Sequence, residues 1–159
     1  MVDVCVIAGS ISDLEVIKKC VSMLKNLEIS YEVHIASAHK SPELVEEFVR
    51  NSDAKVFIAI AGLSAALPGV VAAKTLKPVI GVPCSGKVSL DAILSVVQMP
   101  PGMPVACVSL DGGVNAALLA ARILALQDEK VAEKLKEHRN NTIEEMKKQD
   151  KKIEEELNH

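Results

Sequence analysis

Aromatic side chains are scarce in this sequence of 159 residues, which has no tryptophan, one tyrosine and two phenylalanines. Tyr31, Phe48 and Phe57 lie far apart in the sequence, so they form no platform on which nucleic-acid bases would stack. There is also no cluster of Lys or Arg, and the formal net charge is −3. Because nucleic-acid binding depends strongly on positive charge, we expect no nucleic-acid partner.

Long apolar runs and cysteine motifs are missing as well. No run reaches the roughly 20 residues of a membrane span, and no basic-then-apolar leader precedes the first strand-like segment. We therefore expect no membrane partner and a cytoplasmic location. The cysteines, at positions 5, 20, 84 and 107, form no CxxC pair, and the histidines show no ligand spacing. The sequence thus predicts reduced, buried thiols and no bound metal.

What the sequence does contain is a regular alternation of short apolar runs and helical patterns. The strand-like runs cover residues 2–8, 31–36, 54–61, 78–82 and 105–110, and the helical patterns cover 14–24, 42–51, 65–74, 89–97 and 114–126. This alternation predicts an α/β fold, a doubly wound parallel sheet of about five strands covered by helices. The strand at 54–61 is almost wholly apolar and is expected to be central. We also expect Ser89 to cap the helix at 89–97 and Leu44 to face inward. We expect a single domain over residues 1–159, with its core in residues 1–126.

The tail, residues 127–159, differs in kind because charges of both signs dominate it. Its apolar residues recur every three or four positions: Val131, Leu135, Ile143, Met146, Ile153 and Leu157. The pattern predicts one long amphipathic helix, with Asn140–Asn141 as the expected place of any break. At 1.5 Å per residue such a helix outgrows the domain, so we expect its apolar stripe to pack on a neighbouring subunit. The alternative is a solvated helix that frays at its end.

Four polar loops follow the predicted strands, at residues 9–13, 37–41, 62–64 and 83–87. In an open parallel sheet, ligands bind at the carboxyl ends of the strands, so these loops are candidates for one pocket. The first loop combines Gly9, Ser10, Ser12 and Asp13 with a helix start, which suits a phosphate and ribose hydroxyls. A capping box from Ser12 to Glu15 is the alternative interpretation of the same residues.

The second loop places His39 and Lys40 between two serines, Ser37 and Ser41. It offers a titratable base, a fixed cation and hydroxyl groups in one turn, which is typical of an active site. The alternative is an ordinary helix start, with Ser41 as N-cap and Pro42 in the first turn. The residues alone support a site for a small phosphorylated metabolite with one acid/base histidine.

Several segments together resemble a known family in order and spacing. They are Gly9-Ser10-Ile11-Ser12-Asp13, Ser37-Ala38-His39-Lys40-Ser41-Pro42, the run from Ala61 to Gly69, Gln98-Met99-Pro100, and the run from Asn115 to Ala120. The resemblance is to the aminoimidazole ribonucleotide carboxylase and mutase family of purine biosynthesis, the PurE family, over residues 1–126. It implies a flavodoxin-like fold, a homo-octamer, and a reaction of aminoimidazole ribonucleotide with CO2 that needs no metal or organic cofactor.

The resemblance also implies the roles of individual residues. His39 would be the acid/base group that removes the ring proton, Ser10, Ser37 and Lys40 would bind the phosphate, and Asp13 would hold the ribose hydroxyls. The loop from Gly62 to Ser64 would enclose CO2 or the new carboxylate. Besides catalytic His39, the implied substrate-binding residues are Gly9, Ser10, Ser12, Asp13, Ser37, Ala38, Lys40, Gly62, Leu63 and Ser64.

The family has two branches, and the sequence shares features with each. Lys40 and Ser64 agree with the direct carboxylase, and Ala66 stands where the mutase branch has a second histidine. Pro68–Gly69 and Gln98–Met99 look more like the mutase. We favour the direct carboxylase, with the 5-(carboxyamino)imidazole ribonucleotide mutase as the alternative. A non-catalytic nucleotide-binding module is the alternative of another class.

Overall fold

The computed structural model, which describes residues 2–157, contains a five-stranded parallel sheet in the order β2-β1-β3-β4-β5. The strands are β1 (Val4–Ala8), β2 (Tyr31–Ile35), β3 (Val56–Ala61), β4 (Val79–Pro83) and β5 (Ala106–Cys107). β5 is shorter than the predicted run 105–110. The order is that of flavodoxin-like folds, which confirms the predicted class and the central place of β3.

Helices cover both faces of the sheet. α1 (Leu14–Asn26) and α5 (Gly113–Leu124) pack on one face. The other face carries α2 (Pro42–Asn51), α3 (Leu67–Ala72) and α4 (Ser89–Val97). Successive strand residues point to opposite faces, so Val4, Val6 and Ala8 enter the first core and Cys5 and Ile7 the second. All of β1 and β3 is buried, as the continuous apolar runs predict.

The contact between α1 and α5 explains the small residues of α5. Its buried face is almost entirely alanine and glycine, and a Cβ at Gly113 would collide with the backbone carbonyl of Val16. The two helix backbones therefore approach closely, and this layer sets the position at which α1 begins beside the sheet edge.

Helix starts differ from the sequence prediction at two places. Asp13, and not Ser12, is the N-cap of α1, because a 3₁₀ turn over Ile11–Asp13 precedes the helix. The capping box of Ser12 is therefore wrong. Val88, and not Ser89, is the N-cap of α4. In α2 the inward positions are Val45 and Val49, whereas Leu44, which the pattern placed inward, is 42% exposed.

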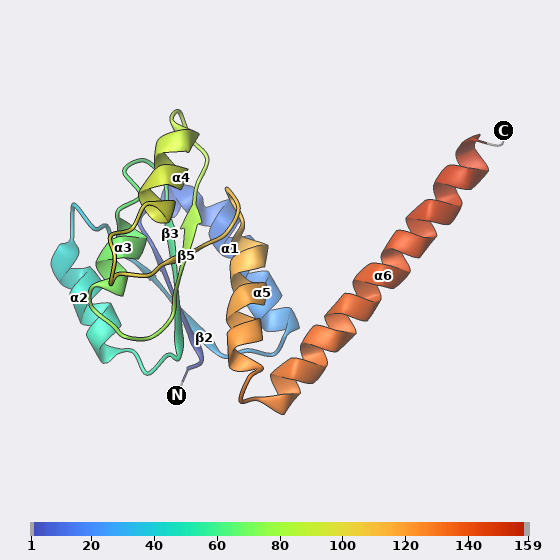
Figure 1. Cartoon of the computed structure of the whole chain (residues 1–159), viewed down its shortest axis with the longest axis horizontal. Coiled ribbons are helices and arrows are strands. Elements are labelled where there is room, and N and C mark those ends of the chain that lie inside the picture. Colours follow the sequence, from blue (N-terminus) through green and yellow to red (C-terminus); the bar gives the residue numbers. More distant parts are fainter. Residues whose placement is uncertain (1, 158–159) are drawn as a thin grey trace.

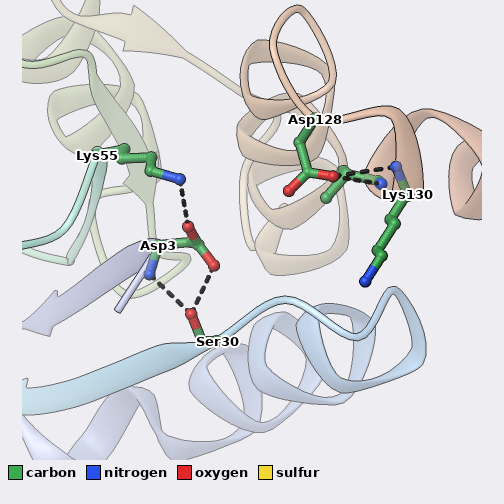
Figure 2. Close-up of polar contacts among 6 residues, drawn as sticks. Asp3, Ser30, Lys55, Asp128 and Lys130 are labelled. Carbon is green, nitrogen blue, oxygen red and sulfur yellow. Dashed lines mark hydrogen bonds and ion pairs between the residues drawn. The ribbon is translucent and has the colours of Figure 1, made fainter. Parts of the chain in front are cut away.

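α6 (Glu129–Leu157) leaves the body as one continuous helix of 29 residues, so no break occurs at 140–141 (Figure 1). Asp128 caps it, accepting hydrogen bonds from the backbone N–H of Lys130 at 3.0 Å and of Val131 at 3.2 Å (Figure 2). Val131 is the one buried residue among those of α6 that the structure describes. The last two residues of the predicted tail, Asn158 and His159, lie outside the described part. Packing of the apolar stripe on a second subunit stays a prediction.

The amino-terminal edge of the sheet is held by polar contacts. The Asp3 carboxylate pairs with Lys55 Nζ at 2.9 Å and accepts a hydrogen bond from the Ser30 hydroxyl (Figure 2). The Asp3 backbone N–H donates to Ser30 Oγ at 3.0 Å. These contacts join the starts of β1, β2 and β3. Among residues 2–157, no helix is both long enough and apolar enough to cross a membrane.

Candidate active site

All eleven site residues named from the sequence line one cavity of about 320 Å³ at the carboxyl edge of the sheet. They are Gly9, Ser10, Ser12, Asp13, Ser37, Ala38, His39, Lys40, Gly62, Leu63 and Ser64. Ala61, Leu67 and Ser85 line it too and were not named. Ser85 belongs to the polar loop 83–87 that follows β4, which is the signal that points to it. The volume lies within the range of small-molecule sites.

The loop after β1 is shaped by backbone and serine hydrogen bonds. The Gly9 N–H donates to the carbonyl of Ile60 at 2.9 Å, which continues the β1–β3 ladder to the cavity. Ser10 is extended, with φ −158° and ψ 152°, and its Oγ accepts from the Ser12 N–H at 3.2 Å. Asp13 makes no side-chain cap bond to α1. Its carboxylate is therefore available to the cavity.

The environment of Asp13 changes its acidity. Burial raises the pKa of the Asp13 carboxyl, a hydrogen bond from the Cys84 thiol lowers it in part, and the charge of Asp111 raises it further. Burial, with the charges of Asp13 and Asp111, raises the pKa of the Cys84 thiol to about 12. Cys84 is thus a protonated donor at neutral pH, which argues against a nucleophilic role.

The loop after β2 closes on itself through hydrogen bonds that do not involve the side chains of its two candidate residues, His39 and Lys40. Ser37 Oγ accepts from the Lys40 N–H at 3.2 Å, and Ser41 Oγ accepts from the Ser37 N–H at 3.0 Å. Ser41 does occupy the N-cap position of α2, but its hydroxyl makes no cap bond, because it turns back toward Ser37. His39 and Lys40 are exposed and form no ion pair with the residues that the structure describes.

The loop after β3 forms a third wall of the cavity. Ser64 has a left-handed backbone with φ 54°, a conformation that is uncommon outside glycine, and its carbonyl accepts from the Ala66 N–H. A Cβ at Gly62 would lie 3.9 Å from Asp13 Oδ1. The backbone of this loop therefore runs close to the carboxylate. Leu63, 75% exposed, forms an apolar rim.

Ser85 is positioned by a residue outside the cavity lining. Its backbone N–H donates to Asp111 Oδ1 at 2.8 Å, and the Asp111 N–H donates to the Pro83 carbonyl at 2.8 Å. Asp111 itself has φ 56°. The turn before α5 thus fixes the loop after β4. Together the four loops offer hydroxyls, a helix start, one cation and one imidazole around a small cavity, which suits a phosphorylated ligand and proton transfer.

Known proteins resemble this chain over nearly its whole length. The AIR carboxylase family model matches residues 3–145. The N5-carboxyaminoimidazole ribonucleotide mutase of Methanocaldococcus jannaschii is 56% identical over 153 residues, which cover 96% of this chain and 98% of the relative. The mutase of Bacillus subtilis is 48% identical over 144 residues, covering 86% of this chain and 89% of the relative.

A solved structure agrees with these relatives. The crystal structure of Treponema denticola PurE has a TM-score of 0.85 at 35% sequence identity, with 94% of this chain and 97% of that chain covered. The fold, the loop motifs and the extent of these matches lead to one conclusion. The chain belongs to the AIR carboxylase family, also called PurE.

Proposed function

We propose that this purine-biosynthesis enzyme converts N5-carboxyaminoimidazole ribonucleotide into 4-carboxy-5-aminoimidazole ribonucleotide. The observation that carries the proposal is the cavity in which His39 shares walls with the phosphate-binding loops and the Gly62–Ser64 loop. Relatives with 48–56% identity bear the mutase name, which supports this alternative over the direct carboxylase that Lys40 and Ala66 favoured.

Substrate binding follows from the polar walls. Lys40 and the hydroxyls of Ser10 and Ser37 face an anionic phosphate, since a cation and O–H groups form charge-assisted hydrogen bonds with it. Asp13 sits beside the start of α1 and accepts hydrogen bonds from the ribose hydroxyls. Its raised pKa reflects a carboxyl held in a partly buried site without a cationic partner.

The chemistry needs one proton donor and acceptor. His39 protonates the nitrogen that carries the carboxylate, so the N–C bond breaks and CO2 is released inside the cavity. The enamine-like ring carbon then attacks CO2, and His39 takes the ring proton, which restores aromaticity. His39 gives one proton to the nitrogen and takes one from the ring carbon, so its own protonation state is restored. A small cavity keeps CO2 next to the ring carbon, so the second step is effectively intramolecular.

The second candidate is direct carboxylation of aminoimidazole ribonucleotide with CO2 from solution. Two residues favour it: Lys40, and Ala66 at the position where the mutase branch has a second histidine. Ala66 is the N-cap of α3, and it is not among the residues that line the cavity. A chain without that histidine has one group fewer for handling the N-linked carboxylate.

Substrate choice tests both candidates. The purified protein is incubated with the carboxyamino ribonucleotide, and separately with aminoimidazole ribonucleotide plus bicarbonate, and 4-carboxy product is measured. We expect the first substrate to give the higher kcat/KM. A higher value for the second would overturn the mutase in favour of the carboxylase. Tight ribonucleotide binding without product in either assay would identify a non-catalytic binding module.

We also propose that the protein works as a single catalytic domain, in the cytoplasm, and assembles as a homo-octamer. The apolar residues of α6 support assembly, because Ile143, Met146 and Leu157 are 45%, 58% and 78% exposed in the single chain. Sedimentation velocity on the full chain and on an Ile143→Lys variant tests it. An octamer that the variant weakens is the expected result, and a monomeric wild type contradicts it.

A further inference from the structure

A second polar cluster lies on the sheet away from the cavity, between β1 and the edge strand β2. Cys5, Glu32 and His34 each place one potential ligand atom in it, and these atoms all lie within 4.8 Å of one another. Cys5 pairs with Glu32 and Ile7 with His34 in the β1–β2 register. Because neighbouring residues across a sheet share a face, all three side chains point to the same side. We propose that these residues bind a zinc ion.

The Cys5 thiol is hydrogen-bonded to the Glu32 carboxylate, and the spacing of the three ligand atoms is also compatible with a metal ion. His34 Nε2 and Glu32 Oε2 are 3.5 Å apart, which is longer than a normal N–H···O hydrogen bond. Two ligands bonded to a tetrahedral zinc at its usual N and O distances are about 3.4 Å apart. In a tetrahedral site Cys5 Sγ would lie about 3.5 Å from the other two ligand atoms, so the three atoms, which lie within 4.8 Å of one another, must move closer together.

The surroundings hold the imidazole and the carboxylate in place. The Phe48 ring stacks on the His34 ring, with centroids 4.1 Å apart and an interplanar angle of 16°. The Ser52 hydroxyl donates to the Glu32 carboxylate, and Ser52 Oγ accepts from the Ala54 N–H at 3.1 Å. Such contacts orient ligands in known metal sites and strengthen them. Here they come from α2 and from the segment that follows it.

The charges also suit a divalent ion. Cys5 is fully buried, and its sulfur lies beside the carboxylate of Glu32. A bound zinc ion displaces the thiol proton, and the resulting thiolate and the carboxylate together neutralise its two positive charges. A set of one thiolate, one imidazole and one carboxylate favours zinc over magnesium or calcium.

The proposed zinc site would leave one coordination position open to water, and the ion would link two strands. The side chains of Glu32 and His34 are 30% and 28% exposed, so water can fill the fourth position. The ion would bind the edge strand β2 to β1, just before the loop that carries His39. The sequence spacing favoured no metal because positions 5, 32 and 34 form no ligand motif until the parallel pairing of β1 and β2 brings them together.

Cobalt serves as the spectroscopic probe. The reduced, chelator-treated, untagged protein is titrated with Co²⁺, and the near-ultraviolet charge-transfer band of a cobalt–thiolate bond is recorded. Zn²⁺ is then added as a competitor, and the melting temperature is measured with and without Zn²⁺. The variants are Cys5→Ala and His34→Gln. Cys20→Ala, a buried thiol on the opposite face of the sheet, is the matched control.

We expect the wild type and Cys20→Ala to bind one equivalent, with a band that Zn²⁺ removes and a higher melting temperature in Zn²⁺. Cys5→Ala should lose the band, and His34→Gln should bind at least 10-fold more weakly. Absence of one-equivalent binding in the wild type, or an unchanged band in Cys5→Ala, overturns the proposal. If Cys5→Ala does not fold, unchanged affinity in His34→Gln overturns it instead, because that side chain is partly exposed.

Discussion

Two aspartates stand at opposite ends of β1 and differ in almost every respect. Asp3, before the strand, pairs with Lys55 at 2.9 Å and accepts a hydrogen bond from Ser30, so its carboxylate is satisfied by other side chains (Figure 2). Asp13, after the strand, makes no ion pair with the residues that the structure describes and faces the cavity. The two residues have the same side chain in different surroundings.

As a result, the pKa shifts of the two carboxyls are opposite in sign. Burial pushes the pKa of Asp3 upward, but the hydrogen bonds from Lys55 and Ser30 outweigh it and hold the pKa below its ordinary value. Burial raises the pKa of Asp13, and no cation offsets it. The amino edge therefore stabilises the fold, while the carboxyl edge holds the Asp13 carboxylate without a cationic partner, at some cost in stability. Groups with perturbed pKa values in a cavity are typical of functional sites.

The strongest test of the contrast between a structural amino edge and a functional carboxyl edge is His39→Asn. We expect turnover to fall by about 10²- to 10⁴-fold, because the acid/base group is lost, while ribonucleotide affinity and melting temperature stay close to wild type. Steady-state kinetics and calorimetric binding measure the two effects. His138→Asn, on α6 and outside the cavity lining, is the control and should keep full activity. Near-normal turnover in His39→Asn would show that the proton is moved by another group.

Lys40→Gln is expected to have the next largest effect, on ribonucleotide affinity, and Lys55→Gln is its matched control. Lys40 has no ion-pair partner among the described residues, whereas Lys55 is committed to Asp3. We expect Lys40→Gln to weaken ribonucleotide affinity by about 10-fold or more, as loss of a hydrogen bond to a charged group does. Lys55→Gln should leave affinity unchanged. Equal effects of the two substitutions would remove the functional distinction between the edges.

Much of this organisation could be predicted from the sequence. Apolar runs that alternate with helical patterns permit few arrangements, and a parallel sheet brings the loops after its strands to one edge. That residues as distant in sequence as Ser10, His39 and Ser64 line one cavity could therefore be predicted from the order of strands and helices alone. The start of α2 at Pro42 was also predicted correctly, since proline fits the first turn of a helix.

Contacts that depend on side-chain geometry could not be predicted. Ser41 sits at the expected N-cap, yet its hydroxyl bonds to Ser37, because the turn brings that backbone N–H closer. The Ser30 contact with Asp3 spans 27 positions and leaves no periodic pattern. The role of Asp111 in holding Ser85 has the same origin, since it joins two loops that meet only in the folded sheet.

Asp13→Asn separates affinity from stability. We expect weaker ribonucleotide binding, by about 10-fold, because the amide accepts fewer hydrogen bonds from ribose hydroxyls. Stability at pH 7 should be equal to or above wild type, since the raised pKa means that ionised Asp13 opposes folding. That gain should vanish as the pH falls below the unfolded-state pKa of about 3.9. Urea unfolding across pH and binding calorimetry measure both, and a large loss of stability at pH 7 would contradict this role.

The smallest expected effect has the opposite sign. Because the pKa of folded Asp3 is lowered, its charge contributes stability above the unfolded-state pKa of about 3.9, and this contribution is lost as the pH falls through the folded-state value. Asp3→Asn should therefore lower the melting temperature at pH 7 by about 2 °C or less, since the pair with Lys55 is exposed to solvent, and the difference should disappear in acid. Ribonucleotide affinity should not change.

Combining Asp3→Asn with Lys55→Gln should lower the stability by less than the sum of the single changes, because each removes the same contact. Strict additivity would mean that the amino edge is stabilised by something other than this pair.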